Sequence, residues 1–97
     1  MSLTSTTPLA GRPLRYLLTI VLIDAQRPLT VAELIDAVER TGLPIAGRPS
    51  KTISDALRWE RAKGRVIRVG RAKYGSGGMP PRTERWIRAQ VRNFVPW

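Results

Sequence analysis

The 97-residue chain contains neither cysteine nor histidine. Without cysteine it forms no disulfide and no thiolate metal site, which suits a reducing cytosol. Without histidine it lacks the commonest general base and the commonest metal ligand. The nearest group of acidic residues, Glu33, Asp36 and Glu39, has the spacing of a solvated helix face. We therefore expect no enzymatic activity, no metal and no other cofactor.

Aromatic residues and long hydrophobic runs are also scarce. Three Trp, two Tyr and one Phe leave the core mostly aliphatic, and the length indicates a single domain. The strongest apolar run, residues 16–23, is too short for a transmembrane helix. The first eleven residues carry no charged side chain, which argues against a signal peptide. We therefore expect a cytoplasmic protein with no membrane partner.

Positive charge is concentrated in the second half of the chain. Residues 1–45 hold four Arg against four Asp and Glu, whereas residues 46–97 hold thirteen Lys and Arg against three Asp and Glu. The whole net charge of +10 therefore lies in the second half. Such one-sided charge favours a polyanionic partner, above all nucleic acid, over a basic surface that serves solubility alone.

The N-terminal part of the sequence predicts an arm and one helix. Residues 1–11 are rich in Ser, Thr, Pro and Gly and predict a flexible arm. Pro13 suits the first turn of a helix that runs to about Gln26, because Pro28 prevents its continuation. Apolar residues occupy two faces of this helix: Leu14, Leu17, Leu18, Val21 and Ala25 on one, and Tyr16, Ile20 and Ile23 on the other. Two such faces indicate either a fully buried helix or contact with another helix or chain, and for the latter we favour the C-terminal segment over a homodimer.

The end signals of a second helix are the clearest local pattern in the chain. Thr30 and Glu33 have the spacing of a capping box, and Leu29 and Leu34 have that of its hydrophobic staple. Gly42 ends this helix, since glycine adopts the left-handed conformation cheaply. The sequence therefore predicts a well-defined helix from residue 31 to about residue 40.

A third helix, a hairpin and a final helix follow. Ser50 is the expected N-cap of the third helix and Gly64 its end, with Ile53, Ala56 and Leu57 facing the core. The hairpin comprises a strand at 66–69, a basic tip at 70–72 and a return at 73–75. Residues 76–82 predict a linker, and Thr83 is the expected cap of an amphipathic helix within the segment 83–97.

Three stretches together resemble a winged helix-turn-helix domain. TVAELIDAVERTG matches the first helix of the motif, SKTISDALRWERAKGRV the recognition helix and RVIRVGRAKYG the wing. The resemblance covers about residues 12–75. It implies a mainly α fold with a small β-hairpin, in which a three-helix core is followed by a C-terminal helix.

One residue departs from the family pattern. Such recognition helices usually carry a second Leu three residues after the first, and this chain has Glu60 after Leu57. A carboxylate there must reach solvent or pair with an Arg, because an unpaired buried charge is costly. Trp59 is expected to supply apolar volume by packing against the wing.

The resemblance implies sequence-specific binding of double-stranded DNA by a bacterial-type transcription regulator. Helix 50–63 would enter the major groove, and the wing at 65–75 would contact the backbone or the minor groove. An architectural, nucleoid-associated protein is the first alternative, a winged-helix protein-interaction module the second, and RNA binding a weaker third. A homodimer on a palindromic site is compatible with the spare apolar faces. No effector domain follows, so we expect no small-molecule ligand.

The candidate DNA contacts lie on the third helix and the wing. Arg58 suits a bidentate contact to guanine, and Asp55 either accepts from cytosine or pairs with Lys51 or Arg58 along the helix. The full set expected to contact DNA is Lys51, Thr52, Ser54, Asp55, Arg58, Arg61, Arg68, Arg71, Lys73 and Tyr74. Additional phosphate contacts are expected from Arg48, Arg85, Arg88 and Arg92, which equally suit the solvated face of a helix.

Overall fold

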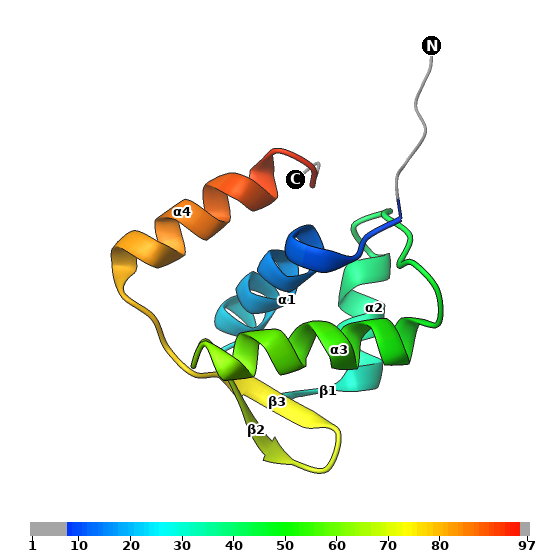
Figure 1. Ribbon diagram of the computed structural model, residues 1–97, viewed down its shortest axis with the longest axis horizontal. Helices are drawn as coiled ribbons and strands as arrows, with labels where there is room; N and C mark the ends of the chain where they lie inside the picture. Colours follow the sequence, from blue (N-terminus) through cyan, green and yellow to red (C-terminus); the bar gives the residue numbers. More distant parts are fainter. Residues whose placement is uncertain (1–7, 96–97) are drawn as a thin grey trace.

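The computed structural model describes residues 8–95, which form four helices and three short strands (Figure 1). In chain order these are α1 (Gly11–Ala25), β1 (Leu29–Thr30), α2 (Val31–Glu39), α3 (Pro49–Ala62), β2 (Val66–Gly70), β3 (Lys73–Ser76) and α4 (Pro81–Arg92). The strands make one antiparallel sheet in the order β1-β3-β2. The prediction of a mainly helical fold with a small hairpin is confirmed, and β1 is an added third strand.

Helix α1 lies at the centre of the fold and packs against α2, α3 and α4. Its buried residues are Leu14, Leu17, Leu18, Thr19, Ile20 and Leu22, so the burial extends around most of the helix. The helix ends where Gln26 takes a left-handed conformation, two residues before Pro28. Both predicted apolar faces are therefore used within one chain.

Helix α2 begins at the predicted capping box. The Glu33 backbone N–H donates to the Thr30 hydroxyl at 3.1 Å, and the Thr30 backbone N–H donates to the Glu33 carboxylate at 2.9 Å. Leu29 and Leu34, the two staple residues, are both buried. Gly42 follows the helix with a φ of +85°, as predicted from its position.

Helix α3 begins one residue earlier than predicted, at Pro49. Arg48 is its N-cap residue and makes no side-chain cap hydrogen bond, so the expected cap by Ser50 is wrong. Proline suits this first position because it lacks the N–H that a helix leaves unpaired there. The core stripe of Ile53, Ala56 and Leu57 is buried as predicted.

The segment before α1 is fixed to the turn between α2 and α3. Leu9 is buried, its N–H donates to the carbonyl of Pro44, and the N–H of Ala46 donates to its carbonyl. Residues 1–7 of the predicted flexible arm lie outside the described residues. Leu9, which was predicted to belong to the flexible arm, is therefore part of the core.

Helix α4 packs on α1 through Ile87 and Val91, both of which are buried. Trp86 meets Tyr16 of α1 edge to face, with ring centroids 5.5 Å apart. The expected packing of the C-terminal helix on the first helix is confirmed. The helix begins at Pro81 rather than at Thr83, within the predicted linker, and has no side-chain cap.

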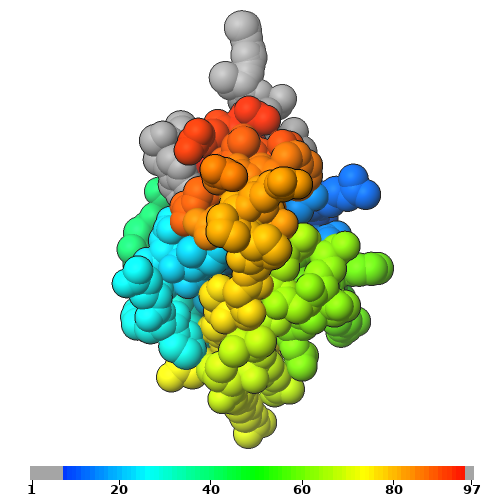
Figure 2. All heavy atoms as spheres, turned by 90° about the vertical axis from the view of Figure 1, so that its left-hand side faces the viewer, coloured from blue at the N-terminus to red at the C-terminus, as the bar shows by residue number. Residues whose placement is uncertain are grey.

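The hairpin and α4 occupy opposite ends of the molecule. In Figures 1 and 2 the hairpin of β2 and β3 extends below α3, while α4 lies across the upper part of α1. None of the helices in the described range has both the length and the hydrophobicity needed to cross a membrane.

The link between β3 and α4 generates a stability prediction. The N–H of Gly77 donates to the carbonyl of Arg65, and a Cβ on Gly77 would overlap the carbonyl oxygen of Gly64. Because backbone cannot move aside cheaply, Gly77→Ala should lower the free energy of unfolding by about 1–3 kcal/mol in urea titrations. Gly75→Ala is the control: its Cβ would meet side chains at 3.8 Å, so stability should hold or rise by up to about 1 kcal/mol.

Candidate nucleic-acid interface

A buried carboxylate connects α3 to α1 and to the start of the hairpin. Glu60 is fully buried, and its oxygens accept hydrogen bonds from Arg15 Nε at 2.9 Å and from Arg65 Nε at 2.7 Å. A second nitrogen of Arg65 donates at 3.0 Å, and the Thr19 hydroxyl donates at 3.1 Å. Every polar atom of this buried carboxylate therefore has a partner.

The pKa of Glu60 lies below its ordinary value. Burial by itself would raise the pKa, but the hydrogen bonds from Arg65 and Arg15 outweigh burial and lower it. Glu60 is therefore ionised at neutral pH. The expectation that this carboxylate must reach solvent or pair with an Arg is met by the second route, with two Arg residues.

This ion-paired cluster sets the rotation of α3 about its own axis. Because Glu60 points inward with Ile53 and Leu57, the opposite side of the helix faces solvent. That side carries Lys51 and Arg58, whose side chains are 69% and 80% exposed. The structure thus places both residues as the sequence predicted, on the outward face.

Asp55 is held by ion pairs along α3. Its carboxylate accepts from Lys51 Nζ at 2.9 Å and lies 3.8 Å from a guanidinium nitrogen of Arg58. The hydrogen bond from Lys51 lowers the pKa of Asp55, with Arg58 adding to the effect. Of the two roles expected for Asp55, pairing along the helix is the one present in this structure.

The remaining predicted DNA contacts on and next to α3 differ in how accessible their side chains are. Arg61 is exposed and Ser54 is half-buried. The hydroxyl of Thr52 donates to the carbonyl of Ala46 at 2.6 Å, so it supports the turn between α2 and α3. Arg48 is exposed directly ahead of the helix. Thr52 is therefore engaged internally, while the charged candidates remain accessible.

The hairpin presents three accessible cations. Arg68, Arg71 and Lys73 are exposed, and Arg68 Nε donates to the carbonyl of Gly70 at 3.1 Å within the hairpin. Tyr74 is half-buried and packs against the core, which leaves it less available than the sequence suggested. The hairpin follows the C-terminal end of α3, contacts this helix through β2 and extends below it with the tip at 70–72 farthest away (Figure 1).

The basic residues of α4 are not brought to this surface. Arg88 pairs with Asp24 at 2.7 Å and with Glu84 at 2.9 Å, and the Asp24 hydrogen bond raises its pKa further above the usual range. Arg88 therefore fastens α4 to α1. Arg85 and Arg92 are exposed, but α4 lies at the end of the molecule away from the hairpin (Figure 2).

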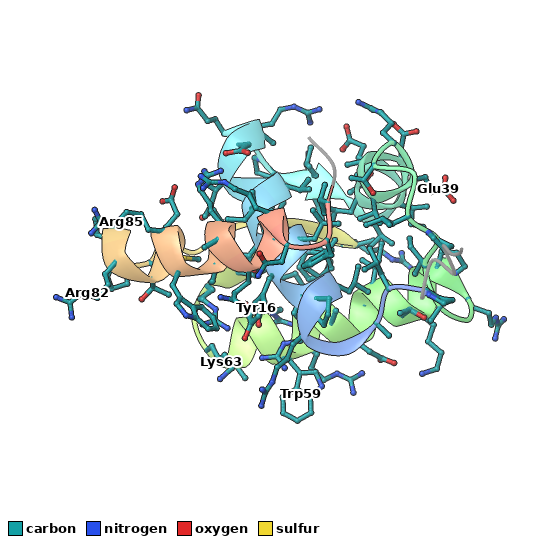
Figure 3. The ribbon with its side chains drawn as sticks, turned by 90° about the horizontal axis from the view of Figure 1, so that it is seen from above. Tyr16, Glu39, Trp59, Lys63, Arg82 and Arg85 are labelled. Atoms are coloured by element: carbon teal, nitrogen blue, oxygen red, sulfur yellow. The ribbon has the colours of Figure 1, made fainter. Side chains whose placement is uncertain are left out.

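Trp59 does not pack against the wing, contrary to the sequence prediction. It is 61% exposed, and the guanidinium carbon of Arg15 lies 5.6 Å from its ring centroid. Figure 3 shows its ring pointing away from the body of the protein, on the same side as Lys63. Arg12 and Lys63 line a pocket beside it and escaped the sequence reasoning, because only the meeting of α1 with α3 brings them together.

Comparisons with known proteins add no family to this geometry. No protein-family model matches the chain, and neither a curated protein nor a solved structure matches it. Within residues 8–95 no group of three acidic side chains is arranged to hold a metal ion. The accessible side chains of α3 and the hairpin are rich in cations.

The Glu60 cluster predicts a pH-dependent stability. Folding lowers the pKa of the Glu60 carboxyl. The contribution of this ionised carboxylate to the free energy of unfolding is therefore complete above its pKa in the unfolded chain, about 4.3, and is lost as the pH falls through its pKa in the folded protein. Glu60→Gln should lower the free energy of unfolding by about 3–5 kcal/mol at neutral pH, because two Arg residues lose their partner.

The same substitution has a clear control. Urea titrations should show the difference between wild type and Glu60→Gln shrinking as pH falls below about 4. Asp36→Asn removes a carboxylate from the exposed pair with Arg40 and should cost less than about 1 kcal/mol. A pH-independent difference for Glu60→Gln would contradict the ionised state assigned to Glu60.

Proposed function

We propose that this protein is a winged helix-turn-helix that binds double-stranded DNA in a sequence-specific manner and regulates transcription. In this proposal α3 enters the major groove, and the hairpin of β2 and β3 is the wing that contacts the backbone or the minor groove. The observation that carries the proposal is a group of exposed cations on two consecutive elements of the motif, which we call the basic face. It comprises Lys51, Arg58 and Arg61 on α3 and Arg68, Arg71 and Lys73 on the hairpin, all of them exposed.

The order and packing of the elements support this proposal. A short capped helix, a turn, a second helix with one outward face and a basic antiparallel hairpin follow one another between residues 31 and 76. The proposed wing belongs to the same sheet as β1, the strand just before α2, because β3 pairs with β1 as well as with β2. This pairing fixes the hairpin relative to α2 and so relative to α3.

The charges of the basic face also support a polyanionic partner. The acidic residues of α3 and the hairpin are Asp55, which pairs with Lys51 and Arg58, and Glu60, which is buried. Phosphate contacts by such side chains position a protein on DNA, while contacts to base edges supply sequence preference. Arg58, with its highly exposed guanidinium near the middle of α3, is the residue best placed to read a base.

A protein-interaction module is the second candidate, because the hairpin also exposes apolar side chains. Ile67 and Val69 are 47% and 45% exposed on β2, next to a groove lined by Leu22, Ile23 and Pro28. An apolar patch of this kind suits a protein partner better than a phosphate backbone. An architectural DNA-binding role differs from the leading proposal only in the ratio of specific to non-specific affinity.

The leading proposal predicts salt-sensitive binding. If the six cations of the basic face neutralise phosphates, affinity for a duplex should fall roughly 10³-fold between about 50 and 200 mM salt. Fluorescence anisotropy with a labelled duplex, chosen by selection from a random pool, measures this slope. Binding that is absent at low salt, or indifferent to salt, would overturn the electrostatic argument.

Arg58→Ala tests base reading directly. It should weaken binding to the selected sequence by about 1–3 kcal/mol and relax preference at one base position, because a bidentate contact to guanine is lost. Arg82→Ala, an exposed Arg on α4, is the matched control and should leave affinity nearly unchanged. Equal weakening on every sequence would instead assign Arg58 to the backbone.

A further inference from the structure

A second basic surface lies on the other flank of α3, between that helix and the first turns of α1. It is an open pocket of about 320 Å³. Its lining residues are Arg12, Arg15, Tyr16, Trp59, Lys63 and Arg65. Four of the six are cations and two are aromatic. Figure 3 shows Trp59, Lys63 and Tyr16 on this side of the molecule, far from the outer end of α4.

The cations of this pocket fall into two pairs. Arg15 and Arg65 are held by the buried carboxylate of Glu60, and their side chains are only 14% and 18% exposed. Arg12 and Lys63 are exposed, and neither forms an ion pair with any residue in the range 8–95. Glu60 is enclosed and does not line the pocket, so its one negative charge offsets only part of the charge of the four cations.

The aromatic ring of Trp59 forms the rim of the pocket. Arg15 lies over one part of the indole, and 61% of the residue remains accessible to solvent. A large apolar ring is costly to leave in water, and the wing does not cover this one. An exposed aromatic ring surrounded by cations can bind a single nucleotide, because the phosphate pairs with the cations and the base stacks on the ring.

We propose that this pocket binds an unpaired nucleotide, with its phosphate at Arg12 and Lys63 and its base against Trp59. The nucleotide is either free or part of a single strand, since both present the same phosphate and the same open base face. The proposal goes beyond duplex binding by the basic face and does not depend on it. None of the six cations of that face lines the pocket.

Calorimetric titration of the full chain with adenosine 5′-monophosphate at low salt tests the proposal. Binding should be saturable and about tenfold tighter than for inorganic phosphate or for adenosine, because only the nucleotide uses both parts of the pocket. The double variant Arg12→Ala/Lys63→Ala should lose about tenfold or more in affinity for the nucleotide. Trp59→Leu should reduce the nucleotide to the affinity of inorganic phosphate.

A charge-matched control separates a site from general attraction. Arg82→Ala/Arg85→Ala removes two exposed cations from the outer end of α4, well away from Trp59 (Figure 3), and should leave nucleotide binding unchanged. Equal weakening by both double variants would overturn the proposal. Thermal unfolding of each variant checks folding, and Trp59→Leu should unfold like wild type because its ring is exposed.

A second titration distinguishes the two sources of the nucleotide. A short single-stranded oligodeoxyadenylate that loses about tenfold in affinity on Trp59→Leu supports a strand as the occupant, and an effect confined to the mononucleotide supports a free ligand. A strand unaffected by Trp59→Leu, together with no mononucleotide binding, would overturn the proposal. Arg58→Ala should weaken duplex binding and leave mononucleotide binding unchanged, so the two proposals fail separately.

Discussion

Glu60 places a charged carboxylate where α1, α3 and the start of β2 meet. Arg15 comes from α1 and Arg65 from the residue before β2, so one side chain joins three elements through ion pairs. A buried charge is stable only while its partners stay in place, because its hydration is lost on folding. This cluster therefore restricts how α3 lies against its neighbours.

Both proposed binding surfaces depend on that restriction. With Glu60 inward, Lys51 and Arg58 face outward, and Trp59 and Lys63 lie beside the first turns of α1. Rotation of α3 by one residue would expose the carboxylate and disperse both groups of side chains. A charge needed for the fold thus also arranges the cations proposed to meet nucleic acid, on two flanks of the same helix.

Helix α1 owes its central position to burial on nearly all sides. One side packs against α2 and α3 and the other against α4, with Tyr16 and Trp86 meeting edge to face. The ion pairs of Arg88 with Asp24 and Glu84 fasten α4 in this place. The C-terminal helix therefore completes the core. Its Arg88 has a structural role, although the sequence pattern suggested a phosphate contact.

Local signals in the sequence determined most of the secondary structure. The capping box of Thr30 and Glu33 and the position of Gly42 predicted α2 correctly, because both depend on hydrogen bonds and backbone angles within a few residues. The predicted N-cap residues of α3 and α4, Ser50 and Thr83, were wrong. Each helix begins with a proline, and neither has a side-chain cap, so the nearest Ser or Thr was misleading.

The candidate site was only partly determined by the sequence. Helical periodicity placed Lys51 and Arg58 on an outward face, but it does not determine whether Glu60 reaches solvent or pairs with an Arg. Only the tertiary structure brought Arg15 to Glu60, across 45 residues, and left Trp59 uncovered beside Arg12. The helical periodicity of the sequence indicates which side chains share a face of one helix. Which distant side chain meets that face is decided by the packing of whole helices.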